Sequence, residues 1–220
     1  MQPGKHENNR VHLQGVVSQP LTYSHTIYEE DYSIAMVEVP RLSGVSDILP
    51  VTIAGRLLRD EAVGTGMPIT VEGQLRSYNK EVDGANRLIL TVFARSLTLH
   101  GPRLENPNLV ELDGYLCRPP VYRTTPFMRE ITDLLLAVNR PFGKSDYIPA
   151  IAWGKNARFA RNFQVGDRIQ VVGRFQSREY QKQQPNGAAV KKVAFELSVS
   201  VLRSVLKDEP PHNGVDVILP

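Results

Sequence analysis

The sequence has few of the residues that form disulfides, metal sites or catalytic centres. Its single cysteine, Cys117, cannot form a disulfide within the chain, which suits a reducing compartment. The five histidines are scattered, with neither an HExxH motif nor another metal-like spacing, and no P-loop motif is present. The glycines of Gly64–Gly66 precede an expected strand rather than a helix, so they are not expected to cradle a phosphate. We therefore expect no enzyme, no cofactor and no metal.

Long hydrophobic runs are also missing. The longest, such as Leu134–Val138, are far shorter than the roughly 20 residues of a membrane-spanning helix. The N-terminal sequence MQPGKHENNR is polar and lacks the apolar stretch of a signal peptide. These features predict a cytoplasmic protein. The 41% hydrophobic and 22% charged residues are typical of a globular chain, and 220 residues suffice for two domains of about 100 each.

The net charge of +3 is unevenly distributed along the chain. Residues 1–107 carry 10 Lys/Arg and 12 Asp/Glu, residues 108–206 carry 15 and 8, and residues 207–220 carry 1 and 3. The second half therefore has a net charge of +7 between two segments of −2. A basic module of this kind favours a polyanionic ligand, nucleic acid first. A well-solvated surface would give the same counts, so charge alone leaves both interpretations open.

The two halves of the chain resemble each other. With a shift of 99, residues 9–59 match residues 108–158 at 15 of 51 positions, where ordinary residue usage gives roughly three. This similarity indicates a tandem duplication of a domain of about 100 residues. We expect an N-terminal flexible tail over 1–8, a first domain over 9–100, a linker over 101–107, a second domain over 108–206 and a C-terminal tail over 207–220.

The second copy predicts a small all-β barrel. A short helix is expected at Asn156–Phe163, between the third and fourth strands, and this order is typical of the OB-fold, a five-stranded Greek-key barrel. Gly114 and Gly173 lie inside strands, where a small barrel must bend sharply. We therefore expect two tandem OB-folds, each with a short helix between its third and fourth strands; other five-stranded barrels share the pattern. The expected strands are Leu109–Leu116, Glu130–Val138, Tyr147–Trp153, Asp167–Phe175 and Val193–Leu202.

Trp153, the only tryptophan, ends the third of these strands. Because alternate residues of a strand face opposite ways, the smaller Ile148, Ala150 and Ala152 suit the crowded barrel interior. Tyr147 and Trp153 are then expected on the outside. A large aromatic is also a common core residue, so the alternative is that Trp153 fills the barrel.

Cations accompany these aromatic residues on the expected outer surface. An aromatic ring can stack on any nucleobase, at about 1–3 kcal/mol per base, and Lys and Arg neutralise phosphates. Neither contact reads base edges, so low sequence specificity is expected. The residues predicted to bind nucleic acid are Arg140, Phe142, Lys144, Tyr147, Trp153, Lys155, Arg158, Arg174, Arg178 and Tyr180. Tyr180 as an ordinary hairpin residue, Phe142 as a loop anchor and any single cation as a solvated charge remain alternatives.

The segments "LLLAVNRPFGKSDYIPAIAWGKNARFA" and "GDRIQVVGRFQSREY" strongly resemble bacterial single-stranded DNA-binding proteins of the replication type. The resemblance covers residues 108–202. It implies that bases stack at positions matching Phe142, Tyr147, Trp153 and Tyr180, and that the protein acts on single-stranded DNA in replication, recombination or repair near the nucleoid. Such proteins usually assemble four barrels, which for a chain with two implies a homodimer.

The first copy has lost most of these aromatic residues. Ile48, Ala54 and Ser43 stand where the second copy has Tyr147, Trp153 and Phe142, and only Tyr78 remains near the Tyr180 position. Since this half is also acidic, it is predicted to bind DNA weakly or not at all and to serve an architectural role. Contact between the first copy and DNA stays open as an alternative at three aromatic positions, Tyr23, Tyr28 and Tyr32.

The C-terminal sequence KDEPPHNGVDVILP has few acidic residues and no terminal Phe. In the resembling family an acidic tail with a hydrophobic tip recruits replication and repair proteins, so this segment is either a weakened version of that tail or a frayed end. Two other functions stay open: a replisome or primosome adaptor whose barrels mainly contact proteins, and an RNA-binding protein.

Overall fold

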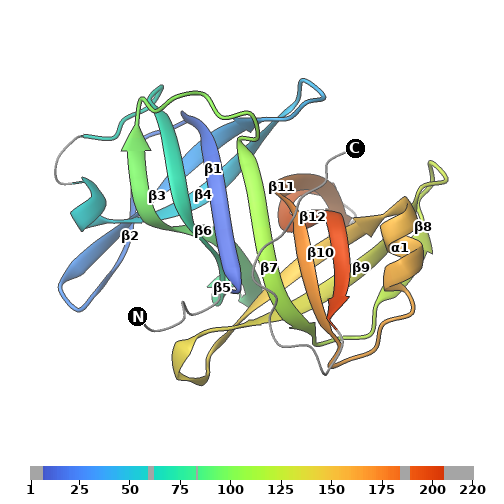
Figure 1. Cartoon of the computed structure of the whole chain (residues 1–220). Coiled ribbons are helices and arrows are strands. Elements are labelled where there is room, and N and C mark those ends of the chain that lie inside the picture. The colour runs from blue at the N-terminus through green and yellow to red at the C-terminus, as the bar shows by residue number, and fades with distance from the viewer. Residues whose placement is uncertain (1–6, 59–61, 83, 184–188, 206–220) are drawn as a thin grey trace.

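The computed structural model describes residues 7–58, 62–82, 84–183 and 189–205 (Figure 1). These residues form twelve strands, two short 3₁₀ segments and one α-helix. No helix in them is long and apolar enough to cross a membrane. Residues 1–6 of the expected N-terminal tail, the loop 184–188 and the tail 207–220, with its predicted recruitment of partners, lie outside the described residues.

The first half of the chain forms a closed barrel. Its strands run in the order β2-β3-β4-β6-β5-β1, and pairing of β3 with β1 closes the ring. A 3₁₀ segment, η1 (Gly55–Leu58), follows the fourth strand in the place of the expected helix. The strands are β1 (Asn9–Val17), β2 (Thr22–Ile27), β3 (Glu30–Pro40), β4 (Ser46–Ala54), β5 (Pro68–Val82) and β6 (Ala85–Leu99).

The second half repeats this barrel. Its strand order is β7-β11-β12-β10-β9-β8, closed by pairing of β7 with β9, and α1 lies between the third and fourth barrel strands as predicted. The fold class, two tandem OB-folds, is thereby confirmed. The short β8, which the sequence did not predict, pairs with β9. The elements are β7 (Asn108–Leu116), β8 (Val121–Thr124), β9 (Glu130–Asn139), η2 (Pro141–Gly143), β10 (Ser145–Trp153), α1 (Gly154–Ala160), β11 (Arg168–Gln183) and β12 (Ala189–Val205).

Alternating apolar residues fill each barrel. On β11 the residues Ile169, Val171 and Phe175 are fully buried or nearly so, as their spacing predicts. Gly173 lies between them at a register shift of the β11–β12 pair, where a Cβ atom would come 2.2 Å from the Ser198 carbonyl oxygen. Only glycine lets the two strands approach this closely.

The two barrels join through one pair of strands. β1 and β7 run antiparallel, with Val11 opposite Val110, so all twelve strands belong to one continuous sheet (Figure 1). The side chain of Asn9 bonds the backbone N–H and carbonyl of Leu75, and Asn108 does the same to Phe175. These contacts explain why asparagine occupies the equivalent position in both copies.

Two buried aspartates extend the joint between the barrels. Asp47 of the first barrel accepts hydrogen bonds from the backbone N–H and hydroxyl of Ser177 in the second, at 2.7 and 2.9 Å. In return, Asp146 of the second barrel accepts one from the backbone N–H of Ser77 at 2.8 Å. Both aspartates are fully buried. The equivalent residues of the repeat thus hold the two barrels together with approximate twofold symmetry.

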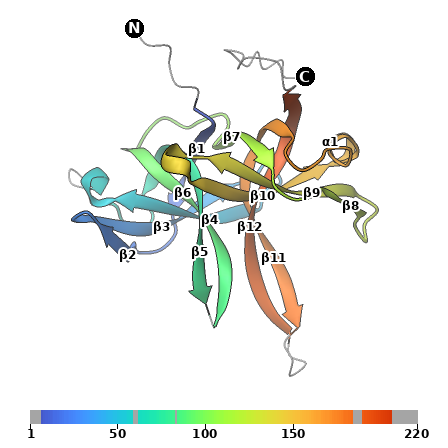
Figure 2. The same ribbon diagram turned by 90° about the horizontal axis from the view of Figure 1, so that it is seen from below.

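The longest strands of each barrel form a hairpin that extends beyond the barrel wall. The β5–β6 and β11–β12 hairpins project from the same side of the molecule (Figure 2). The two barrels are therefore oriented so that their long hairpins extend in a common direction (Figure 2).

Candidate nucleic-acid interface

The four aromatic residues predicted to bind nucleic acid all lie at the surface of the second barrel. The exposed fractions are 36% for Trp153, 47% for Tyr147, 39% for Tyr180 and 98% for Phe142. Trp153 does not fill the barrel, and Phe142 is too exposed to anchor its loop. The buried Ile148, with Ala150 and Ala152, occupies the opposite face of β10 as expected.

Trp153 is held at the end of β10, where the strand passes into α1. Its indole N–H donates to the hydroxyl of Ser198 on the neighbouring β12 at 3.2 Å. This contact fixes one edge of the ring while about a third of the side chain stays open to solvent. A partly exposed indole that is held at one edge is suited to stack on a flat partner.

Tyr180 lies on the β11–β12 hairpin beside a cation. The guanidinium carbon of Arg178 is 5.9 Å from the centroid of its ring, a cation–π arrangement. Arg178 also approaches Glu196 at 3.3 Å, which partly neutralises it. Phe142 lies on η2 with a φ of 62°, a left-handed conformation that costs energy for a residue other than glycine.

The predicted cations differ in how freely they present their charge. Lys144 and Lys155 are exposed. Arg158 is also exposed but forms an ion pair with Glu130. Arg140 lies at the junction of the barrels, 3.5 Å from the buried Asp146 of its own barrel, and it lines a hollow on the first barrel that is described below. Part of its charge is thus used at the junction.

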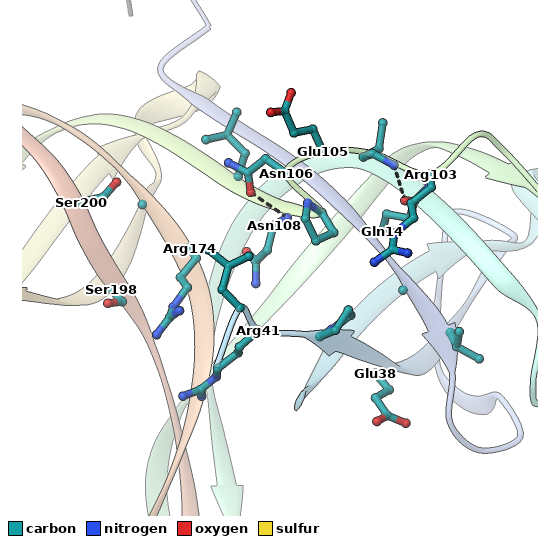
Figure 3. Close-up of a pocket in the computed structure, with 18 of the residues that line it drawn as sticks. Gln14, Glu38, Arg41, Arg103, Glu105, Asn106, Asn108, Arg174, Ser198 and Ser200 are labelled. Atoms are coloured by element: carbon teal, nitrogen blue, oxygen red, sulfur yellow. Dashed lines mark hydrogen bonds between the residues drawn. The ribbon is translucent and has the colours of Figure 1, made fainter. Parts of the chain in front are cut away.

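Arg174 lines a large groove between the barrels, together with Arg41 from the first barrel (Figure 3). The groove has a volume of about 1180 Å³ and reaches Ser198, the residue that holds the indole of Trp153. Burial, and next the charge of Arg41, lower the pKa of Arg174. Sequence reasoning did not select Arg41, although its identity with Arg140 in the repeat was a signal that it matters.

A second hollow, of about 480 Å³, opens on the first barrel. Residues of β2, β4, β5 and β6 line it, and Arg140 enters from the second barrel. Burial lowers the pKa of Arg76 in this hollow, against the hydrogen bond and charge of Asp146, and the charge of Arg140 lowers it further. Burial also raises the pKa of Tyr78. The sequence comparison of the two copies did not predict this feature.

Three rings stack next to the second hollow. His25 and Tyr32 lie parallel with centroids 4.9 Å apart, and Tyr32 meets Phe93 at 5.7 Å with a tilt of 38°. Tyr32 is one of the three tyrosines for which the sequence leaves a nucleic-acid contact of the first barrel open. The other two, Tyr23 and Tyr28, are exposed on the β2–β3 hairpin or its turn.

Comparison with known proteins finds a family profile and several proteins of similar sequence. The profile of the "Single-strand binding protein family" matches residues 107–204. Single-stranded DNA-binding protein 1 of Streptococcus pyogenes is 32% identical over 128 residues, covering 51% of this chain and 98% of that protein. Single-stranded DNA-binding protein A of Bacillus subtilis is 34% identical over 114 residues, 49% of this chain and 62% of its relative.

Similarity in structure extends over both barrels. The wild-type single-stranded DNA-binding protein of Thermus aquaticus superposes with a TM-score of 0.71 at 23% identity, covering 94% of this chain and 96% of that one. A deletion mutant of the same protein gives 0.72 at 24% identity. At this level of identity the match supports the shared fold.

Fold and surface together define an OB-fold protein with aromatic and cationic side chains at the surface of its second barrel. The chain belongs to the single-strand binding protein family. It spans 57% and 62% of the length of two curated relatives, from Halalkalibacterium halodurans and Bacillus subtilis.

Proposed function

We propose that this protein binds single-stranded DNA without sequence preference, in replication, recombination or repair. The observation that carries the proposal is the partly exposed indole of Trp153, held on a strand of the second barrel with Tyr147 and Tyr180 also at the surface. Rigid, exposed rings lose little conformational freedom when a base stacks on them, and each stacked base contributes about 1–3 kcal/mol.

Lys144, Lys155 and Arg174 supply positive charge on the same barrel. Binding to the phosphate backbone releases counterions, so affinity falls steeply as salt rises. The charged side chains and rings contact features common to all four nucleotides, which supports low specificity. The proposed role is binding alone, with no catalytic step and no cofactor.

A fluorescence titration tests the proposal without labelling, because Trp153 is the only tryptophan. Adding oligo-dT to the full chain is expected to quench its emission, and added salt to restore it. Tyr180→Ala should weaken binding by about 1–3 kcal/mol. Tyr115→Ala is the matched control: Tyr115 is 40% exposed, and it pairs with Arg168 at the opposite end of β11 from Tyr180. Equal effects of the two substitutions would contradict the proposed face.

The same titration separates the competing functions. A replisome or primosome adaptor would leave Trp153 emission nearly unchanged by oligo-dT. An RNA-binding protein would prefer an oligoribonucleotide of matched length through contacts with the 2′-hydroxyl.

We further propose that two chains associate into a homodimer with four barrels, each chain contributing domains over 9–100 and 108–206 joined by a linker over 101–107. Two observations support the domain division. β1 and β7 are the equivalent first strands of the two barrels, and residues 101–107 between the barrels form no strand. Light scattering on the eluting protein should give twice the 24.6 kDa mass of one chain. A mass of one chain would reject the dimer.

A further inference from the structure

The turns of two equivalent hairpins each display an aromatic ring to solvent. Tyr28 in the β2–β3 turn and Phe127 in the β8–β9 turn lie 99 positions apart, the shift of the repeat, and are 98% and 86% exposed. The residue after each ring, Glu29 or Met128, has a left-handed φ of 63° or 57°. This backbone conformation costs energy for residues other than glycine, and a ring in solvent gains nothing by packing. Neither feature stabilises its own barrel, which favours a contact with another molecule.

The first of these turns is acidic. Residues 22–31 include three acidic residues and no Lys or Arg. Glu30 lies 3.8 Å from Arg56, whereas Glu29 is exposed and forms no ion pair with any residue that the structure describes. Carboxylates around Tyr28 repel a phosphate backbone, so its ring is poorly placed to stack on DNA. A cationic protein surface suits it better.

Such a cationic surface lies on the second barrel, where α1 flanks the β8–β9 turn. Arg158 on α1 forms an ion pair with Glu130 at the start of β9. The guanidinium carbon of Arg161 lies 5.5 Å from the centroid of the Tyr122 ring on β8. Arg129, in the turn itself, is exposed and forms no ion pair among the described residues. Three guanidinium groups against one carboxylate leave a net positive charge.

Apolar side chains accompany these cations at the turn, where Met128 is 82% exposed next to Phe127. The first barrel does not match this combination in its described part, because its equivalent turn is acidic and the 3₁₀ segment η1 stands in place of α1. We call the combined set the β8 surface. Its members are Phe127, Met128, Arg129, Arg158 and Arg161.

The acidic turn and the β8 surface lie at opposite ends of the molecule. β2 and β8 are the two outermost strands in the order of the sheet, and both views place them far apart (Figures 1 and 2). The acidic turn therefore cannot reach the β8 surface of its own chain. A contact between unlike surfaces of identical molecules repeats head to tail and builds an open row.

We propose that the β2 tip, formed by Ile27, Tyr28 and Glu29, docks on the β8 surface of a second copy of this chain. Glu29 meets the guanidinium groups there, and the ring of Tyr28 packs beside Phe127. This contact goes beyond the proposed function because it needs no DNA, and it differs from the proposed homodimer because it does not close. Opposite charges make it strongest at low salt.

Light scattering on the full chain without DNA, over a range of protein concentrations, tests the contact. At about 0.01 M salt the average mass should rise with concentration, and at about 1 M salt it should not, because the Debye length falls from about 30 Å to about 3 Å. Glu29→Lys and Arg129→Glu should each weaken the association at least about tenfold. A chain with both substitutions exchanges the two charges and should associate again.

Matched controls make the same changes of charge away from both surfaces. Glu81→Lys and Lys191→Glu lie at exposed positions on the long β5–β6 and β11–β12 hairpins and should associate as the parent chain does. Thermal melting checks that each variant is folded.

Two results would overturn the inference. One is a mass independent of concentration at low salt, or a rise that Glu29→Lys and Arg129→Glu leave intact. The other is a loss of oligo-dT binding in Arg129→Glu with unchanged association, which would assign the β8 surface to DNA.

A fluorescent reporter at the β2 tip detects a single contact. The donor chain combines Tyr28→Trp with Trp153→Phe, so that its only indole lies at the tip, and Arg129→Glu, which weakens association with itself. The acceptor chain combines Trp153→Phe with Glu29→Lys, which removes its indole and the charge of its own tip but keeps its β8 surface. Mixing should shift the donor emission until it saturates, and about 1 M salt should reverse the shift.

The matched control is the same acceptor with Arg129→Glu added, which should leave the donor emission unchanged. An equal response to both acceptors, or a response to neither, would contradict the contact. Because no DNA is present in either measurement, the outcome does not depend on whether the proposed function holds.

Discussion

Ser177 of the second barrel donates both its backbone N–H and its hydroxyl to the same carboxylate oxygen of Asp47 in the first barrel. Arg41 donates to this carboxylate as well, and its guanidinium also reaches the carbonyl of Ser177 at 2.9 Å. The fully buried Asp47 is therefore surrounded by donors from both barrels. A charge buried in this way is tolerated because it is paired and hydrogen-bonded.

Removing this carboxylate should destabilise the protein strongly. Asp47→Ala leaves the Arg41 charge and the Ser177 donors partly unsatisfied, so the free energy of unfolding should fall by about 3–5 kcal/mol. Denaturant titration measures it. The control is Asp133→Ala, which breaks the ion pair of Asp133 with Arg123. Because the Asp133 side chain is 42% exposed, the free energy of unfolding should fall by less than about 1 kcal/mol. Similar losses in the two variants would show that Asp47 does not hold the joint.

The same carboxylate predicts sensitivity to acid. Burial alone would raise the pKa of Asp47, but hydrogen bonds from Arg41 and Ser177 outweigh it and hold the pKa below its ordinary value. A pKa lowered by folding contributes stability in full above the unfolded-state value, about 3.9, and this stability is lost as pH falls toward the folded-state value. Unfolding free energies measured from pH 6 downward should therefore decline below about pH 4, and less steeply in Asp47→Asn. Parallel curves for the two proteins would contradict this assignment.

Neighbouring cations on α1 should differ in their contribution to DNA binding. Lys155 is exposed, whereas Arg158 already pairs with Glu130. If Lys155 contacts a phosphate, Lys155→Ala should reduce the slope of log affinity against log salt by about 0.7. Arg158→Ala should change the slope less, because Glu130 competes for its charge. Titrations at several salt concentrations give both slopes. A larger change of slope in Arg158→Ala than in Lys155→Ala would place the bound DNA away from Lys155.

Close approach of β11 and β12 makes Gly173 intolerant of substitution. An added Cβ would lie 2.2 Å from the Ser198 carbonyl oxygen, so Gly173→Ala must push apart the strands that position Trp153. We expect a loss of at least about 2 kcal/mol in unfolding free energy and weaker binding of oligo-dT. Gly64→Ala, whose Cβ would meet only the Met67 sulfur at 3.9 Å, should be nearly neutral. Unchanged stability in Gly173→Ala would contradict this packing.

Periodicity within single strands was enough to predict much of this structure. The alternation along β10 correctly placed Tyr147 and Trp153 outside and Ile148 inside. Contacts between strands cannot be predicted from this periodicity. The place of Arg140 at the junction depends on its contact with the buried Asp146, and an alternating pattern does not show which side chains meet.

Register explains why the hollow of the first barrel escaped sequence reasoning. The loss of Trp153 at Ala54 is visible in an alignment, but Phe93 reaches the hollow from β6, through the parallel pairing of β4 with β6. Strand β8 escaped prediction for a different reason. It has only four residues, which are too few to show a clear alternating pattern.

Joining the barrels through β1 and β7 of one polypeptide has an evolutionary consequence. In an assembly of identical single-barrel subunits, every substitution appears in all copies at once. In this chain a substitution alters one half only, and the covalent tether keeps the halves together at any dilution. The N-terminal half could therefore lose the aromatic residues at Ser43, Ile48 and Ala54 while its neighbour stayed unchanged, so that divergence of the two halves carried no penalty in assembly.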